Sequence, residues 1–384
     1  MVAAGIRPGL ERMERLLRRL RHPETGLHFI HIAGTNGKGS VAAALDSIFR
    51  EAGFRPGLYT SPHLVDFRER IRIGGKMVGA RALQKNMEAL IRVLKKIPPG
   101  ERPTFFEAAT ALALLIFREE RVDFVVWETG LGGRLDATNV ILPELCLLTS
   151  LGRDHEEILG RGWKKIGREK AGILKKGVPV FSVPWPAAAA RILRTRARKL
   201  RCPLRVVRRL PAGVGRPGFH GPHQRWNLSL AREAGRYLGF PETWIRRGLA
   251  KASWPGRFQI LESSPRLVLD GGHNPEGVRA ALRAWRDQFG AYPGRIIFGC
   301  LKDKPACEML REMKRAGAKI WGVNLPDPRG ADPLRWPIFP QRLFYRVQDA
   351  LEADRAEPVL QGTLVMGSLV LAGEVLRVRG WRPV

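Results

Sequence analysis

The sequence predicts an α/β protein of two domains, the first with a parallel sheet covered by helices on both faces and the second smaller. Short apolar strands alternate with helix-like stretches along most of the chain, as in parallel sheets covered by helices. Polar or glycine-rich segments follow several of these strands, where the sites of such folds gather. The run Trp254-Pro255-Gly256-Arg257 interrupts the alternation, so we expect domains over residues 1–254 and 255–384.

Length and composition agree with a globular protein of this size. The chain has 384 residues, of which 44% are hydrophobic and 27% charged. No apolar run approaches the roughly 18 residues of a membrane helix, and the N-terminus lacks the apolar core of a signal peptide. We therefore expect a cytoplasmic protein without membrane contact. The cysteines have no C-x-x-C spacing, and we expect them to be reduced thiols: Cys146, Cys202, Cys300 and Cys307.

The formal net charge of +30 raises the question of nucleic-acid binding. The basic residues are mostly Arg and are spread along the chain, in helix-like segments such as 15–19 and 191–201. They are not interleaved with aromatic residues as in single-strand binders. We expect no nucleic-acid partner and attribute the charge to an arginine-biased composition that also attracts anionic substrates. A basic nucleic-acid-binding protein stays open as an alternative.

In the first domain, apolar periodicity and turn residues predict the elements in order. Residues 9–20 repeat apolar side chains at helical spacing, and residues 103–107 open a long apolar helix. The other expected elements are strands over 28–33, 56–60, 122–127 and 145–149, a hairpin over 70–73 and 76–78, and helices over 41–50, 80–96 and 224–238. Residues 178–220, rich in Arg, Pro and Gly, are the least informative.

The second domain shows the same alternation in a shorter stretch. Its expected strands are separated by helix-like segments, which again indicates an α/β arrangement. These strands lie near residues 258–262, 266–270, 295–299, 319–323 and 362–366.

The run His31-Ile32-Ala33-Gly34-Thr35-Asn36-Gly37-Lys38-Gly39-Ser40 joins a strand to a helix through a glycine-rich turn. Glycines let backbone N–H groups close on an anion, the helix N-terminus adds positive potential, and a lysine reaches the outer phosphates. A following hydroxyl can hold Mg²⁺. The run departs from the general G-x-x-x-x-G-K-[ST] spacing, so a plain turn with Ser40 as helix N-cap is the alternative.

Further polar residues stand where other strands end. Glu128 closes an apolar strand and precedes the glycine loop Thr129 to Asn139, which suits a Mg²⁺ facing nucleotide phosphates. An exposed strand-end carboxylate is the alternative. Ser61-Pro62-His63 and Asp154-His155 also follow strands, and His155 alone is more typical of a polar loop residue.

Helix capping accounts for some polar residues but not for others. Thr104 and Glu107 have capping-box spacing, with a substrate role as the alternative. Asn274 and Pro275 fit the first positions of a helix. Capping does not explain Asp270 and His273 at the mouth of a strand.

Taken together in this order, these segments resemble the folylpolyglutamate synthase/dihydrofolate synthase family, within the larger Mur ligase group. The resemblance covers the chain from about Pro8 to Ser368. Its motifs are HIAGTNGKGS, YTSPHL, TFFE, ETGLGGRLDATN, DHEEILG, IGREKAGI, PGRFQ, LDGGHNPEG, LKDKP and MGS. The GKGS spelling, unusual for a general phosphate-binding loop, is the form found in this family.

The resemblance implies an ATP-binding P-loop domain joined to a smaller Rossmann-like α/β domain, with the site between them. It implies ATP-driven amide formation between a pteroate or folate carboxylate and L-glutamate through an acyl phosphate. The implied partners are dihydropteroate or reduced folates, L-glutamate, ATP and two Mg²⁺ ions. We expect a monomer.

The resemblance also implies roles for individual residues. The nucleotide-binding positions are Thr35, Asn36, Gly37, Lys38, Gly39, Ser40, Asn227, Arg257 and Asp270. The positions on the pterin or folate side are Arg7, Pro8, Gly9, Leu10, Thr104, Phe105, Phe106, Glu107, Leu135, Asp136 and Ala137. The catalytic positions are Lys38, Glu128, His155, Lys170 and His273, the last near the glutamate.

The implied metal ligands include a modified side chain. Ser61 and Glu128 would hold the first Mg²⁺ together with Ser40, and Glu128 and His155 the second. Lys170, which by itself is an ordinary helix lysine, matches the lysine that the family carboxylates with CO₂. The carbamate would turn a cation into an oxygen ligand for the second metal.

This chain departs from the family pattern at a few positions. Glu156 follows Asp154-His155 where the family has a small hydroxylated residue, and Leu228 follows Asn227 where the family has Ala. Residues 183–220 look compressed relative to the family pattern. These departures leave the preferred folate, the glutamate chain length and the use of one or both activities open. Another Mur-type ligase, acting on a cell-wall precursor, is the second alternative.

Overall fold

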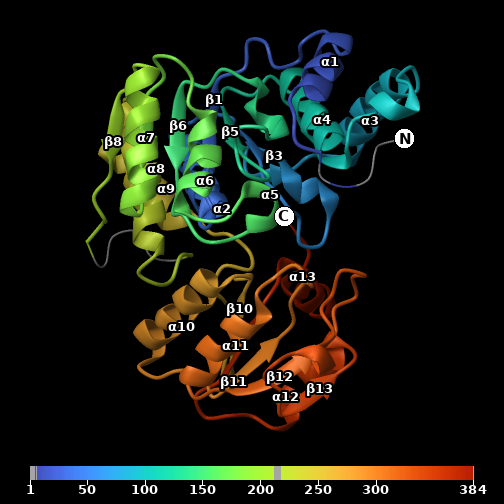
Figure 1. Cartoon of the computed structure of the whole chain (residues 1–384), viewed down its shortest axis with the longest axis vertical. Coiled ribbons are helices and arrows are strands. Elements are labelled where there is room, and N and C mark those ends of the chain that lie inside the picture. The colour runs from blue at the N-terminus through green and yellow to red at the C-terminus, as the bar shows by residue number, and fades with distance from the viewer. Residues whose placement is uncertain (1–4, 6, 212–217, 384) are drawn as a thin grey trace.

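The computed structural model describes residues 5, 7–211 and 218–383. They form two lobes that meet along one side, the second drawn in orange and red (Figure 1). The strands of the first lobe are β1 (Phe29–Ala33), β2 (Gly57–Tyr59), β3 (Ile71–Ile73), β4 (Lys76–Met77), β5 (Val125–Glu128), β6 (Leu145–Leu148), β7 (Val180–Ser182) and β8 (Leu204–Val206). They form one sheet in the order β4-β3-β2-β5-β1-β6-β7-β8, parallel except for the hairpin strands β3 and β4.

Helices cover both faces of this sheet. They are α1 (Glu11–Arg19), α2 (Lys38–Glu51), α3 (Ala80–Leu94), α4 (Phe105–Glu119), α5 (Glu156–Leu159), α6 (Trp163–Lys170), α7 (Ala187–Lys199), α8 (Gln224–Tyr237) and α9 (Glu242–Lys251). Side chains alternate across each strand, so Val126 joins the core under α2, α8 and α9, whereas Trp127 joins the core under α1, α3 and α4. Burial on both faces explains why these strands read as continuous apolar runs.

The second lobe repeats this arrangement on a smaller scale. Its strands are β9 (Gln259–Ser263), β10 (Arg266–Asp270), β11 (Arg295–Phe298), β12 (Lys319–Val323), β13 (Arg342–Phe344) and β14 (Thr363–Met366), in the order β13-β12-β11-β14-β10-β9. Only β9 runs antiparallel to its neighbour. Helices α10 (Pro275–Phe289) and α11 (Ala306–Arg315) cover one face, and α12 (Val347–Ala356) and α13 (Leu369–Val378) the other. The two-domain α/β prediction is confirmed.

The sequence-based elements are largely present, with instructive omissions. The hairpin, the capping box and the N-cap at Asn274 are confirmed. Strands β7, β8 and β13 and helix α9 were not predicted; each of the three strands has only three residues. Helix α2 begins at Lys38, three residues earlier than expected. The predicted boundary between residues 254 and 255 falls in the connection between α9 and β9 and stays a prediction.

No helix in the described part of the chain is both long enough and apolar enough to cross a membrane. The four cysteines are free thiols, three of them buried.

Candidate active site

The glycine-rich turn between β1 and α2 has a backbone that only glycine accommodates at two points. Gly37 precedes the helix with φ of 93°, in the left-handed region. Gly34 has φ of 150°, and a Cβ there would lie 1.8 Å from Oγ1 of Thr149. The turn therefore brings backbone N–H groups and the start of α2 close together, the arrangement that binds phosphate.

Lys38 and Ser40 lie in the first turn of α2. Nζ of Lys38 donates to the carbonyl oxygens of Gly34 and Thr35, at 3.3 and 3.4 Å, and lies 4.0 Å from Oε1 of Glu128. Oγ of Ser40 is buried without a hydrogen-bond partner among the described residues. The alternative prediction, that Ser40 is the helix N-cap, is wrong, because Gly37 occupies the N-cap position and Ser40 lies inside the helix. A buried hydroxyl without a partner at this place suits a metal or phosphate ligand.

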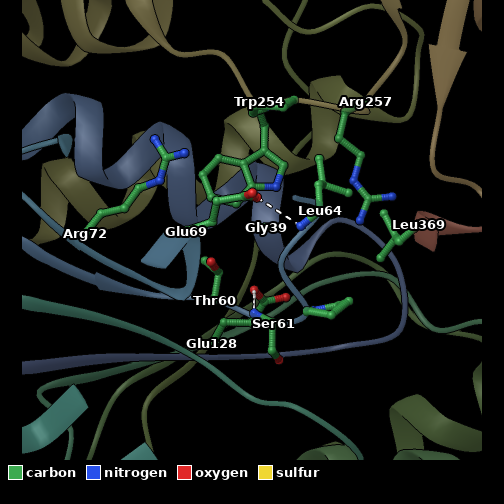
Figure 2. Close-up of a pocket in the computed structure, with 12 residues that line it drawn as sticks. Gly39, Thr60, Ser61, Leu64, Glu69, Arg72, Glu128, Trp254, Arg257 and Leu369 are labelled. Atoms are coloured by element: carbon green, nitrogen blue, oxygen red, sulfur yellow. Dashed lines mark hydrogen bonds between the residues drawn. The ribbon is translucent and has the colours of Figure 1, made fainter. Parts of the chain in front are cut away.

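Glu128 ends β5 and is almost fully buried, so the alternative of an exposed strand-end carboxylate is wrong. Its Oε2 accepts a hydrogen bond from the backbone N–H of Ser61 at 3.2 Å (Figure 2). Burial raises the pKa of Glu128, although Lys38 and Arg257 act in the opposite direction. A carboxylate buried with so little compensation favours a cation beside it.

A small pocket joins Glu128 to the connection between the lobes. Figure 2 shows Trp254 and Arg257 above Glu128 and Ser61, with Gly39 behind. The Trp254 indole packs on the first turn of α2, since a Cβ on Gly39 would lie 2.9 Å from its Nε1. The other residues that line the pocket are Thr60, Pro62, Leu64, Glu69, Arg72, Pro255 and Leu369.

Two further predicted nucleotide contacts lie beside this region. Asn227 of α8 abuts the phosphate loop, since a Cβ on Gly37 would lie 2.3 Å from its Oδ1. Asp270 accepts hydrogen bonds from the backbone N–H groups of Phe258 and Gly272, at 2.8 and 2.7 Å. Burial raises the pKa of Asp270, and Arg257 opposes this. The charge of Arg257 thus acts on one buried acid of each lobe.

Asp154, in the loop after β6, holds the lobes together. It accepts hydrogen bonds from Nζ of Lys304 at 2.8 Å and from Nδ2 of Asn274 at 3.1 Å, and it lies 3.3 Å from Nε2 of His273. Burial opposes ionisation, but these partners hold the pKa of Asp154 far below its usual range. Asn274 also bonds reciprocally to Asn36 of the phosphate loop, at 3.1 and 3.3 Å.

His155 lies toward the second lobe. Its Nε2 is 3.3 Å from Nζ of Lys304, and its Nδ1 is 4.0 Å from Oδ2 of Asp303. Burial lowers the pKa of His155 to about 4, so the imidazole is neutral at pH 7. None of these contacts joins it to Glu128, and its role as a ligand of the second metal stays a prediction.

Lys170, at the end of α6, is buried beside the same region. Burial lowers its pKa to about 7, and the charge of Lys38 acts in the same direction. The glycine loop after Glu128 packs directly on this helix, where the backbone N–H of Arg134 donates to the Glu169 carbonyl at 2.9 Å. A lysine with this pKa has a substantial neutral fraction near pH 7, and the neutral amine can react with CO₂, whereas an ammonium cannot.

In residues 7–211 and 218–383, no group of three or more His, Cys, Asp and Glu could hold a metal ion. A metal at Glu128 would need other oxygens, from Ser40, Ser61, nucleotide phosphates or a carboxylated Lys170.

The predicted acceptor side lies around the start of α4. Oγ1 of Thr104 accepts from the Glu107 N–H at 3.2 Å, and Oε2 of Glu107 accepts from the Thr104 N–H at 2.7 Å. Arg12 of α1 pairs with Glu107 at 2.9 Å and so joins the segment after Pro8, Gly9 and Leu10 to this helix. Phe105 is half exposed.

The remaining acceptor-side positions pack behind this helix start. Phe106 lies against Gly130, where a Cβ would come within 2.4 Å of its ring. Asp136 accepts from the N–H groups of Leu131 and Thr138, at 2.7 and 3.0 Å, which fixes the loop that contains Leu135 and Ala137. The capping roles are confirmed, and contacts with a substrate stay predictions.

Sequence reasoning missed several residues of this region. Lys304 stands in the LKDKP motif, but nothing in the motif indicated a pair with Asp154. Trp254 and Arg72 were not singled out, although the Arg72 guanidinium lies 5.3 Å from the Trp254 ring centroid. Both contacts join segments far apart in the chain, which local spacing does not reveal.

Comparisons with known proteins agree with this geometry. Residues 256–336 match the family model described as "Mur ligase, glutamate ligase domain". The chain is 36% identical over 359 residues to the dihydrofolate synthase/folylpolyglutamate synthase of Bacillus subtilis, covering 85% of this chain and 83% of that protein. It is 32% identical to the folylpolyglutamate synthase of Lacticaseibacillus casei, covering 94% and 92%.

Solved structures are similar over nearly the whole chain. A Mycobacterium tuberculosis folylpolyglutamate synthase complexed with ADP and AMPPCP superposes with a TM-score of 0.90 at 27% identity, covering 98% of this chain and 97% of that one. Escherichia coli FolC in complex with DHPP and ADP gives a TM-score of 0.86 at 30% identity, covering 98% and 94%.

Proposed function

Because the chain belongs to the folylpolyglutamate synthase/dihydrofolate synthase family of the Mur ligase superfamily, and is an ATP-dependent glutamate ligase acting on folates, we propose that its interlobe site catalyses both reactions of the family. One adds L-glutamate to dihydropteroate, and the other adds it to reduced folates. The B. subtilis relative carries both activities in its name, and the E. coli relative is described with DHPP bound.

The observation that carries the proposal is the meeting of three groups at the carboxyl edge of the first sheet. Lys38 lies 4.0 Å from Glu128. The glycine loop after Glu128 packs on the end of α6, where a Cβ on Gly133 would lie 3.3 Å from the carbonyl oxygen of Lys170. On the acceptor side of these groups stand Thr104 to Glu107. A triphosphate on the loop would thus have its terminal phosphate near the end of an acceptor held by α4.

The reaction needs an activated carboxylate, since an oxide ion is too poor a leaving group for direct amide formation. In the proposed sequence, a carboxylate oxygen of the acceptor attacks the γ-phosphorus of ATP and ADP leaves. Lys38 holds the γ-phosphate and stabilises its charge. The neutral α-amine of glutamate then attacks the acyl carbon, the bond from that carbon to the phosphate oxygen breaks, and inorganic phosphate leaves with the proton that the nitrogen loses. Contacts of Asp154 with the second lobe keep the site closed and exclude water from the acyl phosphate.

Magnesium and a carbamate on Lys170 fit the residues present. Ser40, Ser61 and Glu128 would hold one Mg²⁺, and Glu128, His155 and carboxylated Lys170 the second. The buried hydroxyl of Ser40 and the raised pKa of Glu128 support the first site. The lowered pKa of Lys170 supports the modification. When bound, the metal ions neutralise charge on the transferring phosphoryl group.

An assay with two acceptors tests the proposal. Purified protein is given ATP, MgCl₂ and L-glutamate with either dihydropteroate or tetrahydrofolate. We expect ADP and, by mass spectrometry, a product one glutamyl residue heavier in each case. Reactions without glutamate and reactions with a UDP-linked cell-wall precursor serve as controls. ADP formation with only one acceptor would restrict the protein to that activity, and turnover of the UDP-linked acceptor alone would refute the proposal.

A further inference from the structure

The segment after the Ser61-Pro62-His63 turn contains a buried guanidinium that the proposed reaction has not used. Arg70 ends the short 3₁₀ helix η1 (Phe67–Arg70) and is only 8% exposed. Its Nε donates a hydrogen bond to Nδ1 of His63 at 2.9 Å. Two aromatic rings also lie near the guanidinium: its central carbon is 5.9 Å from the Phe67 ring centroid and 5.5 Å from that of Phe105.

The acids nearest in sequence to Arg70 are bound elsewhere. Glu69 accepts hydrogen bonds from the backbone N–H groups of residues 64, 65 and 66, at 2.9, 2.7 and 2.7 Å, and Figure 2 shows the first of them. Asp66 pairs with Arg68 at 2.6 Å. In the part of the chain that the structure describes, no carboxylate lies within ion-pair distance of Arg70. Burying a guanidinium without an anion costs free energy that a ligand anion can offset.

Arg70 lies between the two halves of the proposed reaction. On one side, its carbonyl oxygen accepts from the backbone N–H of Thr60 at 3.1 Å, and the next residue, Ser61, donates its backbone N–H to Glu128 at 3.2 Å. On the other side, it contacts Phe105, which belongs to the expected acceptor segment and is half exposed. The reacting end of an acceptor must lie between these two sides, because the rings occupy one and the terminal phosphate the other.

We propose that Arg70 binds the acceptor carboxylate that becomes the acyl phosphate. A guanidinium presents two parallel N–H donors, which match the two oxygens of a carboxylate. One oxygen would attack the γ-phosphorus while the other stays on Arg70, which fixes the direction of attack. The inference rests on the proposed function, since it needs an acceptor that ends in a carboxylate.

A structural role for Arg70 makes a different prediction. A guanidinium that only balances the charge of Glu128 would not distinguish a carboxylate acceptor from its neutral carboxamide. The experiment therefore measures this preference. Binding of dihydropteroate and of its carboxamide is measured by calorimetry, with a non-hydrolysable ATP analogue and Mg²⁺ present, in the wild type, Arg70→Met, Arg70→Lys and Arg68→Met.

We expect the wild type to bind the carboxylate about 10- to 100-fold more tightly than the carboxamide, as for one charge-assisted bidentate contact. Arg70→Met should reduce this preference to less than about threefold, and Arg70→Lys should retain part of it. Arg68→Met should keep the wild-type preference, because Arg68 is on the same 3₁₀ helix but already pairs with Asp66. The KM for ATP should change less than about twofold in all variants.

An undiminished preference in Arg70→Met, or in Arg70→Lys if Arg70→Met does not fold, would overturn the inference. So would a rise in the KM for ATP that matches the loss of acceptor affinity. Turnover of dihydropteroate and of tetrahydrofolate by the wild type is measured first, because the absence of both would refute the proposed function. Wild-type turnover with an unchanged preference in the variants would refute only the role of Arg70.

Discussion

Two sets of polar groups at the site, one on the first lobe and one at the contact between the lobes, are in opposite states. On the first lobe, Oγ of Ser40 is buried without a partner, burial raises the pKa of Glu128, and burial lowers that of Lys170 to about 7. On the second lobe, Asn274 caps α10 and bonds to the first lobe, and Lys304 pairs with Asp154 at 2.8 Å. The first set therefore lacks partners that the second set already has.

This difference indicates which polar groups of the site bind ligands and which hold the structure in place. Buried polar groups without partners cost stability and are retained where a ligand supplies the missing contact. Satisfied groups instead hold neighbouring parts of the structure in place. Substitutions on the first lobe should thus remove activity at little cost in stability, and substitutions at the interlobe contacts should loosen the arrangement of the lobes.

The largest effect is expected for Lys38→Met. Among the described residues, the ammonium contacts two loop carbonyls and approaches Glu128, so the substitution should cost the folded protein little stability. The transferring phosphate loses its main side-chain cation, and kcat should fall by on the order of 10³-fold. Steady-state ADP formation and thermal unfolding, measured together, check this. A loss of activity explained by a lower melting temperature would contradict the view that Lys38 serves the reaction and not the stability of the fold.

Lys170→Ala should also cripple turnover, by about 10²- to 10³-fold, if the side chain acts as a carbamate ligand. Short carboxylates such as acetate should restore part of the activity, since they supply the missing oxygens. Lys38→Met, which has no carbamate to replace, is the control and should not respond to acetate. Full activity of Lys170→Ala without any additive would rule out the carbamate.

The pH dependence of wild-type activity also tests the carbamate on Lys170. The folded-state pKa of Lys170 is lowered to about 7, so the neutral amine that reacts with CO₂ predominates above that pH. At a fixed, limiting concentration of dissolved CO₂, activity should fall as the pH decreases through 7 and should recover with added CO₂. Initial rates between pH 6 and 8 at two CO₂ concentrations measure this. An identical profile at both concentrations would argue against the modification.

The interlobe pair should show a smaller effect of a different kind. Lys304→Met removes the lysine that pairs with the buried Asp154, and Asp154→Asn leaves Lys304 with Asp303 as its remaining counterion, at 3.3 Å. Removing one partner of a comparable buried pair costs about 3–5 kcal/mol. Here part of that cost would appear as opening of the lobes, seen as a larger radius of gyration by X-ray scattering and a lower kcat/KM. The double variant should be less affected than the sum of the single ones.

A matched control for this pair lies within the first lobe. Lys251 and Glu51 are 2.6 Å apart, but the lysine is largely exposed. Lys251→Met should change neither the scattering profile nor kcat/KM. Strictly additive effects of Asp154→Asn and Lys304→Met would show that the pair does not couple the lobes.

The same contrast explains how much the sequence could predict. Local patterns indicated the glycine-rich loop, because glycines, lysine and hydroxyl are adjacent, and Glu128, because it ends an apolar strand. Each pattern left an alternative open, a plain turn with Ser40 as N-cap and an exposed carboxylate, which the position of Ser40 inside α2 and the burial of Glu128 exclude. Local patterns were not sufficient for Lys304 or Arg70. Their partners lie 150 and 7 residues away, and the significance of each depends on which neighbours are already paired.

Short elements were missed for a related reason. Strands β7 and β8 have three residues each. Because β8 is an edge strand whose side chains are partly exposed, its sequence contains no apolar run that would indicate a strand. Their positions in the sheet are set by pairing, of β7 with β6 and of β8 with β7, which no local periodicity encodes.

The smallest effect is expected at Thr104, where capping and substrate contact can be separated. Its hydroxyl accepts the Glu107 N–H, so Thr104→Ala should lower the free energy of unfolding by about 1 kcal/mol. Thr104→Ser keeps the hydroxyl and should restore most of that stability. If Thr104 only caps α4, the KM for dihydropteroate should be unchanged in both variants. A higher KM in Thr104→Ala that Thr104→Ser corrects would mean that the hydroxyl also faces the acceptor, and that a satisfied group can serve both stability and binding.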